Sequence, residues 1–167
     1  GLPRYRDETP EYSDNPEHND TFLLSGAEDL VPLRYHSDER FIEYRPRTEG
    51  LFALIRRYYD AKNDYWLVKT KDGLSSWYGT PQKRGNDPAA IFYPAKPLRV
   101  FSWMLSETRD TFGNRIVYAY ERDLGIGEDD NQRLWNQLYL KSVHYADYRD
   151  AGGNNQFLIG VHLNYDG

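Results

Sequence analysis

The feature that most constrains this chain is a two-residue alternation of apolar and polar side chains, interrupted by close turns. The clearest case is the segment that carries Phe157, Ile159, Val161, Leu163 and Tyr165 at every second position. Alternation of this period places one set of side chains on one face of a β-strand. Turn-forming sequences separate such segments: Asp72-Gly73, residues 110–114 and residues 150–155. The pattern predicts an all-β fold of antiparallel meanders and hairpins, with at most short helical turns.

The same criteria predict the other strands. They are expected at Thr21–Leu24, Arg40–Tyr44, Leu51–Tyr59, Tyr65–Thr70, Leu74–Tyr78, Arg99–Thr108, Ile116–Tyr120 and Leu138–Tyr148. Leu51–Tyr59 and Arg99–Thr108 are apolar on both faces, which predicts that both faces are covered. Gly113 is expected at positive φ in its turn, because glycine adopts that conformation without a steric cost.

Two stretches lack the alternation. Residues 1–20 are polar and contain three prolines, so we expect an irregular N-terminal arm ahead of one β-domain at residues 21–167. Gly79–Pro97 contains four prolines, which exclude a regular helix. Single helical turns are expected only at Ala89–Phe92 and Arg133–Gln137. The start at Gly1, without an initiator Met, suggests a fragment of a larger protein.

Composition excludes several classes of function. Aromatic residues make up 16% of the chain, too much apolar surface for a disordered tail. The chain has no Cys, which excludes disulfide scaffolds, thiolate metal sites and cysteine nucleophiles. A net charge of -5 argues against nucleic acid as a partner. The longest apolar stretch, Gly50–Ile55, is far below the ~20 residues of a membrane-spanning helix.

No group of residues nominates a metal, cofactor or catalytic site. The four histidines, His18, His36, His144 and His162, have no metal-ligand spacing along the sequence. The loop Asp123–Asn131 contains Gly125-x-Gly127-x-Asp129, which is like one unit of a calcium-binding β-roll. Such rolls need stacked copies, so we expect a solvated loop that does not bind calcium tightly.

The tryptophans allow two interpretations. Trp66, Trp77, Trp103 and Trp135 have the side chains that stack on sugar rings, which would make weak glycan binding a function. The other interpretation is core packing: Trp103 lies between Phe101 and Leu105 in a strand, and Trp66 and Trp77 would pack across neighbouring strands.

A family resemblance rests on motifs spread over most of the chain. Residues 110–120 read D-T-F-G-N-R-I-V-Y-A-Y, similar to the D-x-x-G-N-x-x-x-Y-x-Y unit of Rhs or YD repeats. The flanking motifs are L-S-G-A-E-D-L-V-P at 24–32, R-P-R-T-E-G-L-F-A at 45–53, V-F-S-W-M-L-S-E-T at 100–108 and L-Y-L-K-S-V-H-Y at 138–145. Together they resemble the SpvB-like family, which includes the N-terminal region of the SpvB virulence toxin and the B subunits of insecticidal toxin complexes.

The resemblance implies a non-enzymatic shell module of a secreted bacterial toxin, which packages or presents a toxic domain. Its partners would be other regions or subunits of that toxin, and it would reside in the cytoplasm before release. No catalytic residue of the family maps onto this sequence. The alternative is a stand-alone β-domain that binds carbohydrate or another surface.

Overall fold

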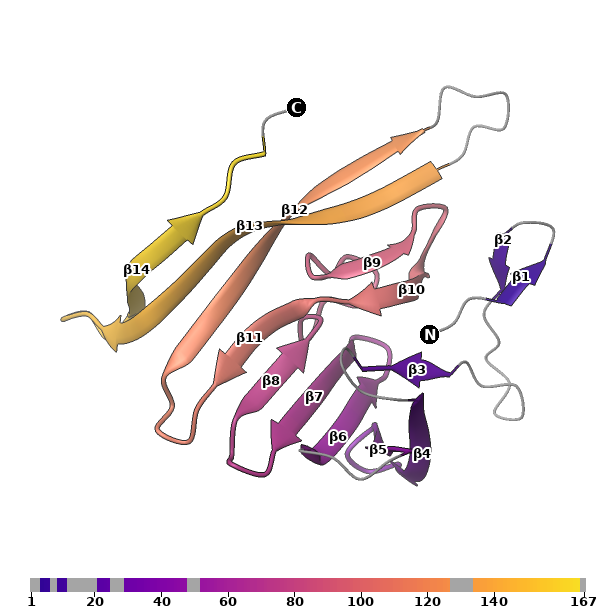
Figure 1. Ribbon diagram of the computed structural model, residues 1–167, viewed down its shortest axis with the longest axis horizontal. Coiled ribbons are helices and arrows are strands. Elements are labelled where there is room, and N and C mark those ends of the chain that lie inside the picture. Colours follow the sequence, from indigo (N-terminus) through magenta and orange to yellow (C-terminus); the bar gives the residue numbers. More distant parts are fainter. Residues whose placement is uncertain are drawn as a thin grey trace.

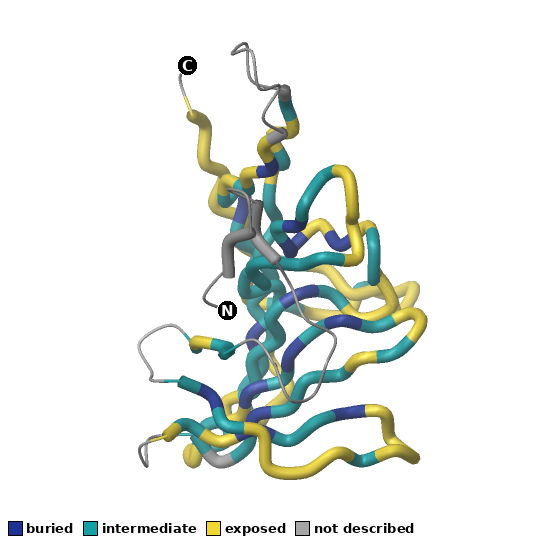
Figure 2. The backbone as a smooth tube through the Cα atoms, turned by 90° about the vertical axis from the view of Figure 1, so that its right-hand side faces the viewer, coloured by how far each residue is buried: buried dark blue, intermediate teal, exposed yellow. Residues whose placement is uncertain are grey.

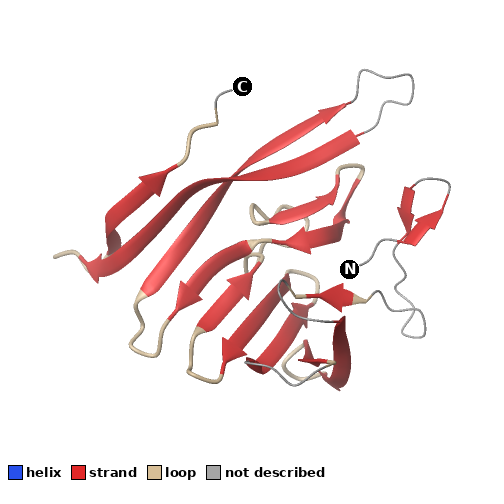
Figure 3. Ribbon diagram, viewed as in Figure 1, coloured by secondary structure: helices blue, strands red, loops and turns tan. Residues whose placement is uncertain are grey.

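In the computed structural model, residues 4–6, 9–11, 21–24, 29–47, 52–126 and 134–165 are described. Within these ranges every regular element is a β-strand and every strand pair is antiparallel (Figures 1 and 3), which confirms the predicted fold class. The strands are β1 (Arg4–Arg6), β2 (Thr9–Glu11), β3 (Phe22–Leu23), β4 (Asp29–His36), β5 (Phe41–Pro46), β6 (Phe52–Tyr59), β7 (Asp64–Thr70), β8 (Ser75–Tyr78), β9 (Ala90–Tyr93), β10 (Lys96–Trp103), β11 (Leu105–Arg109), β12 (Arg115–Ile126), β13 (Leu134–Arg149) and β14 (Asn155–His162).

One ten-stranded sheet contains most of the strands. Its order is β14-β13-β12-β11-β8-β7-β6-β5-β4-β3, so chain neighbours are also sheet neighbours except where β9 and β10 are inserted. Such an up-and-down order follows from short turns, because a close turn joins only antiparallel neighbours. β1 and β2, within the expected N-terminal arm, pair with each other.

The inserted β9–β10 hairpin forms its own two-stranded sheet and corrects two predictions. The expected helical turn at Ala89–Phe92 is wrong, since residues 90–93 form β9. The segment Arg99–Thr108 is two strands: β10 pairs with β9, whereas β11 pairs with β8 and β12. Met104 joins them, because its N–H donates to Ala89 O of the hairpin and its carbonyl accepts from Gly79 N beside the main sheet.

Buried polar groups fix the hairpin to the main sheet. Arg122 of β12 donates to the carbonyls of Asp87 and Ala90, and Asn136 of β13 donates to Phe92 O at 2.8 Å. Asp87 in turn accepts from the backbone N–H of Thr80 and Ala89. The hairpin therefore depends on contacts distant in sequence.

The remaining differences concern strand ends and one strand, β4, that was not predicted. β13 begins at Leu134, so the helical turn expected at Arg133–Gln137 is wrong for its described residues. β4 was not predicted, because Pro32 and a bulge between Pro32 and Arg34 interrupt its alternation. β5 continues to Pro46, opposite Leu30. β12 extends to Ile126, so the start of the expected loop Asp123–Asn131 is strand; residues 127–133 lie outside the described residues.

The core lies on β4 to β7, whose strands contain buried residues (Figure 2). Leu30, Tyr44, Ile55, Trp66 and Val68 form the buried cluster, against which Phe22, Tyr78 and Trp103 pack. Phe41 is buried next to Tyr58, with the Arg56 guanidinium over its ring. β6 is an interior strand, between β5 and β7, as its apolar faces predicted.

Two turns have the same structure. In residues 110–114 and 150–154, the first aspartate accepts two backbone N–H bonds and one bond from the asparagine four residues later. Gly113 and Gly153 have φ values of 91° and 79°. The positive φ predicted for Gly113 is confirmed, and the sequence D-x-x-G-N encodes this turn locally.

Candidate functional site

An apolar groove of about 670 Å³ lies between the main sheet and β10. The residues that line it include Phe22, Trp66, Tyr78, Trp103, Leu105 and Tyr120. The Tyr120 hydroxyl donates to Leu105 O at 2.7 Å, and burial raises the pKa of Tyr120 to about 12. The phenol is therefore a neutral donor near pH 7, and its hydrogen bond joins β12 to β11.

A buried ion pair borders the groove. Arg57 on β6 donates through Nε and Nη2 to Asp64 Oδ1 on β7, at 3.0 and 2.9 Å. Burial raises the pKa of Asp64, and Arg57 opposes that shift. The guanidinium also lies over the rings of Phe22 and Trp103, 4.8 and 5.0 Å from their centroids. Its charge is compensated within the protein, and its ring contacts connect β6 with β3 and β10.

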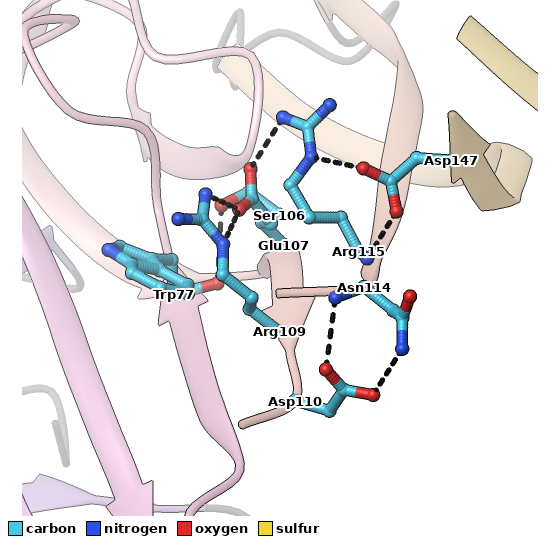
Figure 4. A network of polar contacts seen from close by, with 8 residues as sticks. All are labelled: Trp77, Ser106, Glu107, Arg109, Asp110, Asn114, Arg115 and Asp147. Carbon is cyan, nitrogen blue, oxygen red and sulfur yellow. Dashed lines mark hydrogen bonds and ion pairs between the residues drawn. The ribbon is translucent and has the colours of Figure 1, made fainter. Parts of the chain in front are cut away.

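The opposite face carries a polar network across four strands (Figure 4). Glu107 of β11 accepts from Arg109, and its other carboxylate oxygen lies 3.9 Å from Arg115 of β12. Arg115 donates through its backbone N and through Nε to Asp147 of β13, at 2.7 and 3.1 Å. The Arg109 guanidinium lies 5.2 Å from the Trp77 ring centroid on β8. These polar groups bind one another, and the network ties β8, β11, β12 and β13 together.

At the end of the β12–β13 ladder, the Asp147 side chain accepts a hydrogen bond that a backbone carbonyl would accept in a regular ladder. The residue before it, Ala146, has a φ of 58°, a conformation that non-glycine residues rarely adopt within a strand. The backbone N–H of Arg115 is then bound by the Asp147 carboxylate, and this hydrogen bond lowers the pKa of Asp147. The kink therefore occurs where β13 separates from β12 but remains paired with β14.

β14 forms the edge of the described sheet and is largely exposed. It pairs with β13 alone among the described strands, and its sequence, N-Q-F-L-I-G-V-H, contains no Lys, Arg, Asp or Glu. Leu158 is 72% exposed and Val161 45%. The N–H of Leu163 donates to Lys141 O, so in a regular ladder the odd-numbered residues face β13 and the even-numbered ones direct N–H and C=O outward. Such an edge, without Lys, Pro or a bulge, is a surface for strand pairing.

The four candidate tryptophans separate into different environments. Trp66 is buried in the core and Trp103 packs against it, with its indole N–H donating to Asp64 O at 2.7 Å. Trp77 packs under Arg109. Trp135 is 40% exposed and lies on Gly125, where an added Cβ would be 1.9 Å from the indole. Trp66 and Trp103 are thus core residues, and Trp135 is the exposed aromatic platform.

The structure also brings together histidines that the sequence separates. His144 on β13 and His162 on β14 have ring centroids 5.5 Å apart. His36 stacks on Phe41 and lies 3.5 Å from Glu43, and His18 lies outside the described residues. Sequence spacing missed the His144–His162 pair because 17 residues, including a turn, separate the two histidines. Only the register of the two strands that this turn joins brings the histidines together.

The described ranges contain neither a candidate metal cluster nor a candidate membrane-spanning helix. No cluster of three or more His, Cys, Asp or Glu side chains in those ranges is arranged to hold a metal ion. The same residues include no helix with the length and apolarity needed to cross a membrane.

These features define an all-β module: an open antiparallel sheet with a hairpin packed on one face and an exposed edge strand. Residues 1–165 match the family model described as SpvB, Salmonella virulence plasmid 65kDa B protein. The chain belongs to the SpvB family.

Solved structures agree with this assignment. The N-terminal domain of effector protein SpvB from Salmonella typhimurium strain LT2 is 21% identical, with a TM-score of 0.72 over 98% of this chain and 59% of that one. The TcdB2-TccC3 structure is 25% identical, with a TM-score of 0.62 over 76% of this chain and 7% of that one. TcdB2-TccC3-TEV is also 25% identical, with a TM-score of 0.61 over 78% and 7%. The chain thus spans less than two thirds of each of these polypeptides, and no curated protein matches it.

Proposed function

We propose that this chain is a non-enzymatic shell module of an exported bacterial toxin and that other regions of the toxin polypeptide cover its open sheet. The observation that carries the proposal is the β14 edge, which exposes apolar side chains and lacks protective charge. An isolated protein with such an edge risks association, whereas a module within a longer sheet uses it for pairing. The family description, a virulence protein, and the partial coverage of the solved chains support this context.

The charged residues pair between strands, which supports a structural role for the chain. Arg57 with Asp64, Arg115 with Asp147, and Arg122 with Ala90 of the β9–β10 hairpin all join strands to one another. Charged groups with strand-to-strand partners contribute to the geometry of the sheet. A module that holds a fixed curved surface needs such contacts, and the apolar groove provides a face on which another part of the toxin would pack.

The test compares the chain by itself with the longer toxin polypeptide that contains it. For the isolated chain we expect binding of a dye that detects apolar surface, self-association in sedimentation velocity, and fast amide exchange at Leu158 and Gly160. In the longer polypeptide both amides should be protected. If the isolated chain is strictly monomeric, binds no dye and gains no stability or protection in the longer polypeptide, the shell-module proposal fails.

A matched pair of variants distinguishes the effect of the β14 edge on self-association from the effect of any exposed leucine. Leu158→Lys places a charge on the exposed edge strand and should reduce self-association of the isolated chain. Leu98→Lys, at another exposed leucine, 58% accessible on β10, is the control and should leave association unchanged. Equal effects of the two substitutions would argue against a specific role of β14.

The second candidate function is carbohydrate binding at Trp135. The observation in its favour is the exposed indole of Trp135, which contacts Gly125; an exposed indole is suited to stacking on a sugar ring. A glycan array tests it: binding by the isolated chain that is lost in Trp135→Ala and retained in Trp77→Phe, a variant within the polar network, would favour this function over the shell module.

A further inference from the structure

We propose that His144 and His162 form a binding site for a divalent transition-metal ion, with Zn²⁺ as the reference ion, on the outer strands β13 and β14. The proposal is independent of the shell-module function, because it rests on two side chains and a glycine of this chain. The two strands are neighbours in the sheet (Figure 1), and Ser142 is directly opposite His162. His144 is therefore one diagonal position away from His162, on the same face.

The separation of the rings fits a shared ion. The centroids are 5.5 Å apart. With Zn–N bonds of about 2.1 Å and a tetrahedral N–Zn–N angle, two coordinating imidazole rings have centroids roughly 5.3 Å apart. The observed separation is therefore close to that of two imidazole rings that share one ion.

Gly160 gives the space between the nitrogens. It is opposite His144 in the ladder. An added Cβ at Gly160 would lie 3.3 Å from His144 Nδ1 and 3.5 Å from His162 Nε2. Both nitrogens thus border the same open volume, which any larger residue would occupy. The side chains are also accessible, since His162 is exposed and His144 is half-buried.

Ser142 can select the tautomer of His144 that binds metal. Its hydroxyl oxygen is buried and lies 2.9 Å from His144 Nε2. In the tautomer with hydrogen on Nε2, that nitrogen donates to Ser142 Oγ and leaves the Nδ1 lone pair directed to the metal. Metal-binding histidines usually donate their second ring N–H to such a partner, which orients the ring. Imidazole nitrogens suit Zn²⁺, Ni²⁺ and Cu²⁺, and water would complete the coordination.

The experiment titrates the untagged chain with Zn²⁺ and follows heat and the imidazole Cε1–H resonances. We expect one saturable Zn²⁺ per chain, with the resonances of His144 and His162 shifting together while that of His36 stays fixed. His162→Ala should lower the affinity at least tenfold, and Gly160→Ala should do the same although both histidines remain. His36→Ala is the matched control and should bind Zn²⁺ like the original chain.

Three results would overturn the proposal. The first is no saturable binding by the original chain at millimolar Zn²⁺. The second is binding that survives in both His162→Ala and Gly160→Ala. The third is an equal response to Mg²⁺, which prefers oxygen ligands and should not shift the imidazole resonances. Because His162 and Gly160 are exposed, circular dichroism of both variants should match the original chain and exclude misfolding as the cause.

Discussion

Replacing Gly113 isolates the conformational requirement of the D-x-x-G-N turn. Gly113 has a φ of 91°, and an added Cβ would meet no atom within 4 Å. A side chain at this position therefore costs only backbone conformational energy, with no collision. That cost is roughly 1–2 kcal/mol for a residue with a Cβ, and more for β-branched valine.

The expected result of Gly113→Val is a loss of about 1 kcal/mol or more in the free energy of unfolding. For a domain of this length, each 1 kcal/mol lowers the melting temperature by roughly 2–4 °C. Gly113→Asn should lose much less, because asparagine adopts positive φ more readily than other residues. Gly153→Val, in the second turn with a φ of 79°, should resemble Gly113→Val.

Gly79→Ala is the contrasting variant. Gly79 also has positive φ, at 78°, but its added Cβ would lie 2.7 Å from Trp103 Cδ1 and 2.9 Å from Asp87 Oδ2. It should therefore destabilise more than Gly113→Ala, since a steric cost adds to the conformational one. Urea denaturation of the five variants measures both effects. An unchanged midpoint for Gly113→Val, or equal losses for the two alanine variants, would refute this reasoning.

Other predictions concern burial and charge. Asp87→Ala should destabilise by about 2–4 kcal/mol in urea denaturation, because the buried N–H groups of Thr80 and Ala89 lose their acceptors; stability like that of the original chain would show that water replaces the carboxylate. Hydrogen bonds from Asn114 and Asn154 lower the pKa values of Asp110 and Asp150 in the folded state. The contribution of the two ionised carboxylates to folding stability is therefore complete above the unfolded pKa of about 3.9. It is lost as pH falls through the pKa values of the folded state. Denaturation between pH 6 and 2.5 should therefore show a smaller acid-induced loss in the double variant Asp110→Asn/Asp150→Asn than in the original chain; equal losses would contradict it.

The sequence by itself determined the features that depend on neighbouring residues. Alternation in Phe157–Val161 and the D-x-x-G-N sequences specify strands and turns locally, because side-chain direction and positive φ are properties of a few consecutive residues. The all-β class and the positive φ of Gly113 followed from these. The motifs between residues 24 and 145 also carried the family resemblance, which the match over residues 1–165 confirms.

Tertiary structure decided the features that depend on contacts distant in sequence. Ala89–Phe92 is short enough for either a helical turn or a strand, and Arg122 and Asn136, more than 30 residues away, stabilise the strand. The segment Arg99–Thr108 alternates continuously, yet Met104 divides it between two sheets because each half has a different pairing partner.

The histidine pair shows the same limit. His144 and His162 are 18 positions apart, and no metal-ligand motif connects them. They meet because the turn at 150–154 fixes the register of β13 against β14, and a shift by one residue would place them on opposite faces. Local sequence encodes the turn and the strands, whereas the register that the folded sheet adopts decides which side chains share a site.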